Sequence, residues 1–368
     1  MEWIGYPHGR QSVVCRAGIV VLLACATVGI LWAGTAQAAQ LKKNPFQDRV
    51  IRASAPAAKS ASASGLPRYP VAGGGSVSVQ VDPAYAGGGA LQRVLDSLGE
   101  LPHGAEMNKL TVHIADQGNL FRFCGQGATA CYYPADETMV VSGSPINQNN
   151  GMPQGMVIAH EYGHHIEANR SLTGWNASNL GGRHWATYEN VCEGVSAGRL
   201  FPGDQGAHYW DNPGEAFAQA YATMLYPDVV PWWWDFAEPN DGSFAAIRAD
   251  VADGSRGTTV RWSRKLAPGA STAATTVTTS LDGPIEVKLR QPRSARFDLT
   301  LRSADGRTLS RGHVKRSSKT PVSRLSYSSC GTRTFTLQVR RRAGRGKFQA
   351  KIRGRVGVRA VRGRASSR

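Results

Sequence analysis

The chain has 368 residues, of which 41 % are hydrophobic and 19 % are charged, so it can bury the cores of two folded domains and is not a disordered polymer. Its net charge of +17 is unevenly spread. From residue 251 onward there are 28 Lys and Arg against 5 Asp and Glu, whereas the first 250 residues hold 15 basic and 21 acidic side chains. This asymmetry predicts two parts with different partners.

The N-terminus has the pattern of an export signal. Arg10 and Arg16 precede an apolar run at 17–33, and Ala-Gln-Ala at 36–38 fits a cleavage site between small residues. The run is near the lower length limit of a membrane-spanning helix, which makes an anchor the alternative. We expect residues 1–38 to be removed as a signal peptide, so that the mature protein has no membrane span. It would be secreted, extracellular or in the cell envelope.

Two of the six cysteines belong to this signal, and four remain: Cys124, Cys131, Cys192 and Cys330. An even number of cysteines in an exported protein indicates disulfides. Cys124 and Cys131 flank a short Gly-containing loop and are the best pair. Cys192 with Cys330 follows by elimination, and this bond would join the two halves of the chain.

The next segments alternate between helical and extended patterns. Residues 39–75 are rich in Ala, Ser, Gly and Pro, which indicates a flexible linker or pro-region. Apolar residues recur at helical spacing in 90–102 and alternate in 109–116 and 137–144, as they do in strands. Pro153 suits the first turn of a helix predicted over 153–169.

Helices are also predicted over about 186–198, 213–226 and 243–252, completing an α+β domain at 76–253. After residue 257 the helical periods stop, and short alternating runs separated by turn pairs predict a β-sandwich at 257–354. Residues 355–368 have the composition of a disordered basic tail.

The stretch Val157-Ile-Ala-His-Glu-Tyr-Gly-His-His165 contains the motif that carries the chemistry. Residues four apart share a helix face, so His160 and His164 present two imidazoles to one point, as tetrahedral zinc requires. Glu161 is placed to reach a water in the open coordination position without binding the metal. It is therefore the candidate general base for attack on a carbonyl. The alternative is a solvated helix face rich in histidine.

A catalytic zinc site of this kind needs a third protein ligand. Glu215 is favoured because Pro213 and Gly214 open a helix on which Glu215 lies in the first turn, followed by small and aromatic residues that can pack tightly. Glu193 and Glu189 are the alternatives. Such an enzyme also needs a group that stabilises the oxyanion of the tetrahedral intermediate. The candidates are Tyr209 and His208, shortly before Glu215. The alternative is that both are packing or surface residues.

The motif His160–His164, followed at a distance by Glu215-Ala-Phe-Ala, resembles the zinc metallopeptidases of the gluzincin type. The stretch Cys-Tyr-Tyr-Pro-Ala-Asp-Glu-Thr-Met-Val-Val-Ser-Gly at 131–143 resembles the bacterial neutral zinc metallopeptidases, in which such a turn leads to the edge strand of the substrate cleft. This resemblance covers about 76–250. It implies a zincin-like catalytic domain in which His160, His164 and Glu215 bind Zn²⁺. The separation of His164 from Glu215 is longer than in thermolysin-like enzymes.

The basic half resembles, in its pattern of short alternating runs, the small β-sandwiches of the pre-peptidase C-terminal type that are appended to secreted bacterial peptidases. Its basic side chains either form a surface that keeps the protein soluble or bind an anionic polymer of the cell envelope. The sequence has no specific nucleic-acid motif.

Together these features predict a monomeric, secreted zinc metallopeptidase that hydrolyses peptide bonds of a peptide or protein substrate with a zinc-activated water. The alternatives are an envelope-attached binding protein with a non-catalytic zinc site, and a cell-wall amidase that uses the same metal chemistry.

Overall fold

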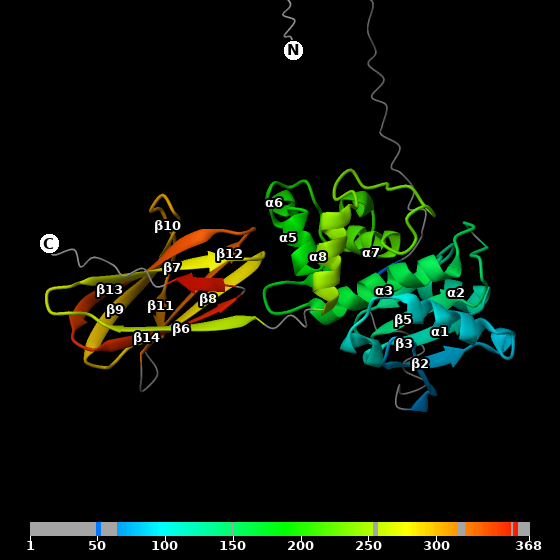
Figure 1. The fold of residues 1–368 in the computed structure, drawn as a ribbon, viewed down its shortest axis with the longest axis horizontal. Helices are drawn as coiled ribbons and strands as arrows, with labels where there is room; N and C mark the ends of the chain where they lie inside the picture. Colours follow the sequence, from blue (N-terminus) through cyan, green and yellow to red (C-terminus); the bar gives the residue numbers. More distant parts are fainter. Residues whose placement is uncertain are drawn as a thin grey trace, which may run out of the picture. The chain divides into compact units, whose positions relative to one another are not determined.

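The computed structural model describes residues 49–52, 65–148, 150–252, 257–315, 321–354 and 356–359. The expected signal peptide lies outside these ranges. In the described residues, helices and strands are mixed up to Ser142, helices follow from Gln154 to Ala252, and strands follow from Thr258 (Figure 1), so the chain has the predicted α+β composition. Within these ranges no helix is long and apolar enough to cross a membrane.

The first domain contains a five-stranded mixed sheet. Its strands are β1 (Arg68–Pro70), β2 (Ser76–Val81), β3 (Thr111–Ala115), β4 (Ala130–Tyr133) and β5 (Thr138–Ser142), in the order β1-β2-β3-β5-β4. The three inner strands are parallel, and the two edge strands are antiparallel to their neighbours. Strand β1 lies inside the stretch 39–75 that was predicted to be a linker. The domain begins earlier than predicted because this short strand pairs with β2 and is followed by the buried Val71.

The helices of this domain are α1 (Ala90–Glu100), α2 (Gln117–Cys124), α3 (Gln154–Arg170), α4 (Ala177–Leu180), α5 (Arg183–Tyr188), α6 (Val191–Ser196), α7 (Pro213–Thr223) and α8 (Asp241–Ala252). Short 3₁₀ turns are η3 (Pro83–Tyr85), η4 (Ala105–Lys109) and η5 (Tyr209–Asp211). The predictions of α1, α3, α7 and α8 are confirmed. The single helix predicted over 186–198 is wrong, because Asn190 adopts the left-handed conformation (φ 57°) and separates α5 from α6.

Helices cover both faces of the sheet. Along β4 and β5, Tyr132 and Met139 belong to the main core with α1 and α3, whereas Cys131 and Val140 belong to a smaller core with α2. This is the alternation that a strand buried on both sides requires. The predicted disulfide Cys124–Cys131 is present and joins the end of α2 to β4. Strand β5, expected to be the edge strand, is an inner strand, and β4 takes the edge.

Helices α3 and α7 approach each other closely at Gly163. A Cβ added to Gly163 would lie 2.6 Å from Ala218 Cα and 3.2 Å from Ala218 O, both backbone atoms of α7. The sequence places a glycine on one helix and an alanine on the other at this crossing. Their small side chains allow the two backbones to come together, and the charged residues of both helices meet beside this contact.

We expect Gly163→Ala to destabilise the protein by about 1–3 kcal/mol, the usual cost of overpacking a close contact. The substitution should also weaken metal retention, because it pushes apart the two helices that carry the candidate ligands. Thermal unfolding and metal content measure the two effects. Gly118→Ala in α2 is the control, since its nearest neighbour would be the Asp116 side chain at 3.4 Å, an ordinary contact. Equal stability of both variants would contradict the tight crossing.

The second domain consists of two five-stranded antiparallel sheets. Their strands are β6 (Thr258–Lys265), β7 (Thr272–Thr279), β8 (Gly283–Arg290), β9 (Ala295–Arg302), β10 (Thr308–Arg311), β11 (His313–Lys315), β12 (Val322–Ser329), β13 (Thr334–Gly344), β14 (Lys347–Gly354) and β15 (Val356–Arg359). The orders are β10-β9-β13-β7-β15 and β11-β12-β8-β14-β6. Alternate residues of the strands, such as Ile285, Val287 and Leu289 of β8, form one buried apolar cluster. A sandwich is therefore the architecture.

Two further predictions concern this domain. The disulfide Cys192–Cys330 is present, and it links α6 of the first domain to the residue after β12. The tail predicted to be disordered from residue 355 is wrong for 356–359, which form β15 by pairing with the edge of β7. An unpaired strand edge accepts any chain that can extend along it, and composition alone does not reveal such pairing. Residues 360–368 lie outside the described ranges.

Candidate metal site

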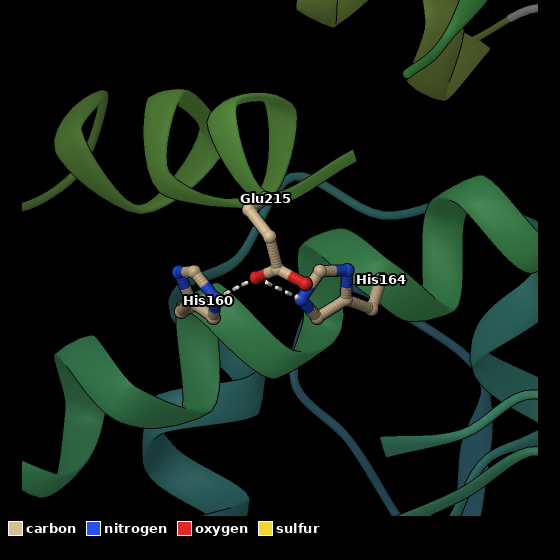
Figure 2. Close-up of side chains that lie close together, drawn as sticks. All are labelled: His160, His164 and Glu215. Atoms are coloured by element: carbon tan, nitrogen blue, oxygen red, sulfur yellow. Dashed lines mark ion pairs between the residues drawn. The ribbon is translucent and has the colours of Figure 1, made fainter. Parts of the chain in front are cut away.

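Three of the predicted site residues converge on one point. His160 and His164 lie one turn apart on α3, and Glu215 lies in the first turn of α7 (Figure 2). Glu215 Oε2 is 3.6 Å from His160 Nε2 and 3.3 Å from His164 Nε2. One ligand atom from each of the three residues lies within 4.8 Å of the other two. The two imidazoles and the carboxylate therefore form a group that could hold a metal ion.

The other nitrogen of each imidazole is held by a neighbouring side chain. His160 Nδ1 lies 3.2 Å from Gln219 Oε1, and His164 Nδ1 lies 2.9 Å from Glu167 Oε2. Oxygen acceptors at these positions favour the tautomer with hydrogen on Nδ1, which leaves each Nε2 lone pair directed at Glu215. Metal-binding histidines are oriented in this way by outer partners.

Sequence reasoning missed Gln219 and Glu167. A usable signal existed, because each lies one helical turn after a predicted ligand, Gln219 after Glu215 on α7 and Glu167 after His164 on α3.

The site gathers three carboxyl groups away from water. Glu161, Glu167 and Glu215 are all 0 % exposed, and the two histidines are 1 % exposed. Burial raises the pKa of Glu167 to about 8, against the opposing effect of His164. Buried carboxylates are costly unless they are paired or coordinate a cation. A divalent metal between the imidazoles would supply the positive charge that this cluster needs.

Glu215 is fixed at the head of α7 by several contacts. The Asn212 side chain caps the helix by accepting from Gly214 N at 3.1 Å. Gln205 Nε2 donates to Glu215 Oε1, and the Tyr209 hydroxyl donates to Glu215 Oε2 at 3.2 Å. These bonds orient the carboxylate toward α3.

The two alternative third ligands lie elsewhere. The Glu193 side chain is 34 % exposed, and its Oε1 lies 3.5 Å from Arg333 Nη2. Glu189 is the residue at the end of α5, and burial raises its pKa to about 7. Among the described residues, the group whose ligand atoms lie close enough together to hold a metal ion contains Glu215 and neither Glu193 nor Glu189.

The two oxyanion candidates take different positions. Tyr209 is buried, contacts Glu215 through its hydroxyl, and packs on Trp210 and Trp234 with ring centroids 5.2 and 6.2 Å away. His208 is 44 % exposed and stacks on the ring of Phe201. The geometry thus places Tyr209, and not His208, against the candidate ligand group. Trp234, one of the tryptophans after Pro231, is thus part of the packing that holds Tyr209.

A second polar network anchors α3 to the sheet. His165, the last residue of the stretch 157–165, is fully buried. Its Nδ1 lies 2.8 Å from the hydroxyl of Tyr132 on the edge strand β4, and its Nε2 lies 2.9 Å from Glu106 O. Burial lowers the pKa of His165 to about 4, so it is a neutral imidazole at pH 7. Its contacts fix the rotation of α3 and with it the direction of the two candidate ligand histidines.

The chain matches no protein-family model, and no curated protein is significantly similar to it. Its function must therefore be inferred from the site itself.

Proposed function

We propose that the protein is an exported, zinc-dependent peptidase with a zincin-like catalytic domain. The convergence of His160 Nε2, His164 Nε2 and Glu215 Oε2 supports this function most strongly. Two imidazoles and one carboxylate are a ligand set of catalytic zinc, which keeps its fourth coordination position for water or substrate. Within the described ranges the group has these three members, which fits such an open position.

Bound zinc would polarise a peptide carbonyl and lower the pKa of a water molecule. Glu161 follows His160 on α3 and is buried with it. In this proposal Glu161 accepts the proton of the attacking water and returns it to the leaving amine. Tyr209 stabilises the developing oxyanion with the hydroxyl that otherwise donates to Glu215 Oε2.

The substrate in this proposal is a peptide or protein outside the cell, and the protein acts as a monomer. Both disulfides fit an oxidising compartment. The same zinc chemistry would cleave an amide of the cell wall.

The burial of the group favours a second candidate function. All three candidate ligands are at most 1 % exposed. A structural zinc ion keeps no open coordination position, and a group this buried would give a substrate little access to the ion. In this alternative, zinc stabilises the contact between α3 and α7, and the protein is an envelope-attached binding protein.

Metal analysis together with digestion of a peptide library tests both functions. We expect about one zinc ion per chain, lost in His160→Ala and His164→Ala, and cleavage that stops on chelation and resumes with zinc. Zinc retention without any cleavage would favour the structural role. Parent protein without zinc would contradict both functions.

A further inference from the structure

One face of the sandwich domain carries a row of basic side chains. The pairing of β11, β12, β8, β14 and β6 places one basic residue of each strand directly opposite the next, in the order His313, Arg324, Lys288, Lys351 and Arg261. Paired residues of antiparallel strands project from the same face. We call these five residues the basic row. At the usual strand spacing of about 4.8 Å, it presents a positive group at each step from Arg324 to Arg261.

The row faces solvent and not the core. His313, Arg324 and Arg261 are exposed, and the two lysines are partly exposed. The neighbours of Lys288 along β8, Val287 and Leu289, are in the core, so the alternation of the strand directs Lys288 outward. The basic row therefore forms a surface that a ligand can reach.

This arrangement is unfavourable for folding. Like charges directly opposite one another in a sheet are destabilising. The charge of Arg353, with smaller contributions from desolvation and from Arg261, Lys288 and Arg290, lowers the pKa of Lys351. A sheet surface that needed only solubility would alternate the two signs of charge. The repeated positive sign is accordingly better explained by a ligand that supplies the negative charge.

The basic row runs along a groove of about 810 Å³. This volume is in the range of ligand sites. Beside the row, the groove is lined by two further arginines and by hydroxyl, amide and carboxylate side chains: Arg290, Arg353, Ser263, Ser326, Gln349 and Glu286. Glu286 lies opposite both Ser326 and Arg353. A carboxylate, an amide and hydroxyls are suitable hydrogen-bond partners for sugar hydroxyls.

The groove also lacks the features of a site for single-stranded nucleic acid. Its one lining residue among Phe, Tyr and Trp is Trp262, which is buried and packs on Phe348 in the core with ring centroids 5.0 Å apart. Apart from the imidazole of His313 at one end of the row, the described lining residues thus offer no aromatic face on which a base could stack.

We propose that this groove binds a linear acidic polysaccharide, with its carboxylates on the basic row and its hydroxyls on the polar residues beside the row. The sandwich would then hold the protein on an anionic glycan. This function is independent of the metal site, so it holds whether or not the first domain is a peptidase.

Binding of the whole protein to fluorescent polygalacturonate fragments, followed by anisotropy at several salt concentrations, tests the proposal. Arg324→Gln, Lys288→Gln and Lys351→Gln together should weaken binding on the order of tenfold or more and flatten its salt dependence. The matched control is Arg296→Gln, Arg307→Gln and Arg340→Gln, which removes the same charge from exposed positions outside the groove. This control should bind nearly as the parent does.

The row variant should melt at or above the temperature of the parent, because it relieves repulsion between like charges. If the row variant fails to fold, two other variants provide the test. Lys288→Arg with Lys351→Arg keeps the charge and should keep binding. Lys288→Glu reverses one charge and should weaken binding. Neutral dextran should not bind. An equal loss of affinity in the row and control variants would overturn the proposal, because net charge alone would then explain the binding. Tighter, row-dependent binding of single- or double-stranded DNA at matched charge would overturn it in favour of a nucleic-acid surface.

Discussion

Replacing Glu161 with glutamine should abolish peptide hydrolysis and leave the metal in place. Glutamine keeps the size of the side chain but does not accept a proton at neutral pH. Loss of a general base typically costs about 10²- to 10⁴-fold in rate. Since Glu161 is not one of the three converging residues, zinc content should be unchanged. The measurements are kcat on a cleaved library peptide and zinc per chain.

Glu167→Gln is a matched control for this prediction, because Glu167 is an equally buried glutamate on the same helix. Its role is to hold His164 Nδ1, so this variant should bind zinc about 10- to 100-fold more weakly and regain hydrolysis when zinc is in excess. Hydrolysis by Glu161→Gln at the rate of the parent would refute the assignment of Glu161 as the base. Loss of zinc from Glu161→Gln would make it a ligand.

The helices of the site could be predicted because their signals are local. Pro153 precedes α3 and Pro213 opens α7, and the spacing of His160 and His164 needs only helical geometry to define a shared face. Glu215 could be favoured over Glu193 because small residues follow it, and the close contact between Gly163 and Ala218 is the packing that this composition predicts.

The features that were missed depend on contacts between distant segments. The edge position of β4 is decided by which strand pairs with β5, and β15 exists because β7 offers a free edge. The break at Asn190 requires a left-handed residue that helical periodicity does not reveal. The basic row is likewise a consequence of strand register. Its residues are scattered from 261 to 351 in sequence, and only the pairing brings their charges into line.

Replacing Glu215 with alanine should remove the metal, whereas Glu193→Ala and Glu189→Ala should retain it. Glu215 Oε2 is the atom that both Nε2 nitrogens approach, and the capped first turn of α7 holds it there. Two imidazoles alone leave the ion with an incomplete protein ligand set. We expect zinc affinity to fall by more than the roughly 100-fold upper range for loss of an outer-shell partner. Zinc content after dialysis against a weak chelator measures this directly.

The same substitution predicts a change in stability that does not depend on any substrate. A metal that binds only the folded state at about 1,000 times its Kd adds about 4 kcal/mol of stability. EDTA should therefore lower the unfolding temperature of the parent, Glu193→Ala and Glu189→Ala, and should not change that of Glu215→Ala. Glu215→Gln keeps the bulk of the side chain and serves if the alanine variant does not fold. Should Glu215→Ala keep its zinc and its sensitivity to EDTA, the third ligand would be another residue, and the convergence of Glu215 on the two histidines would be an ordinary buried ion pair.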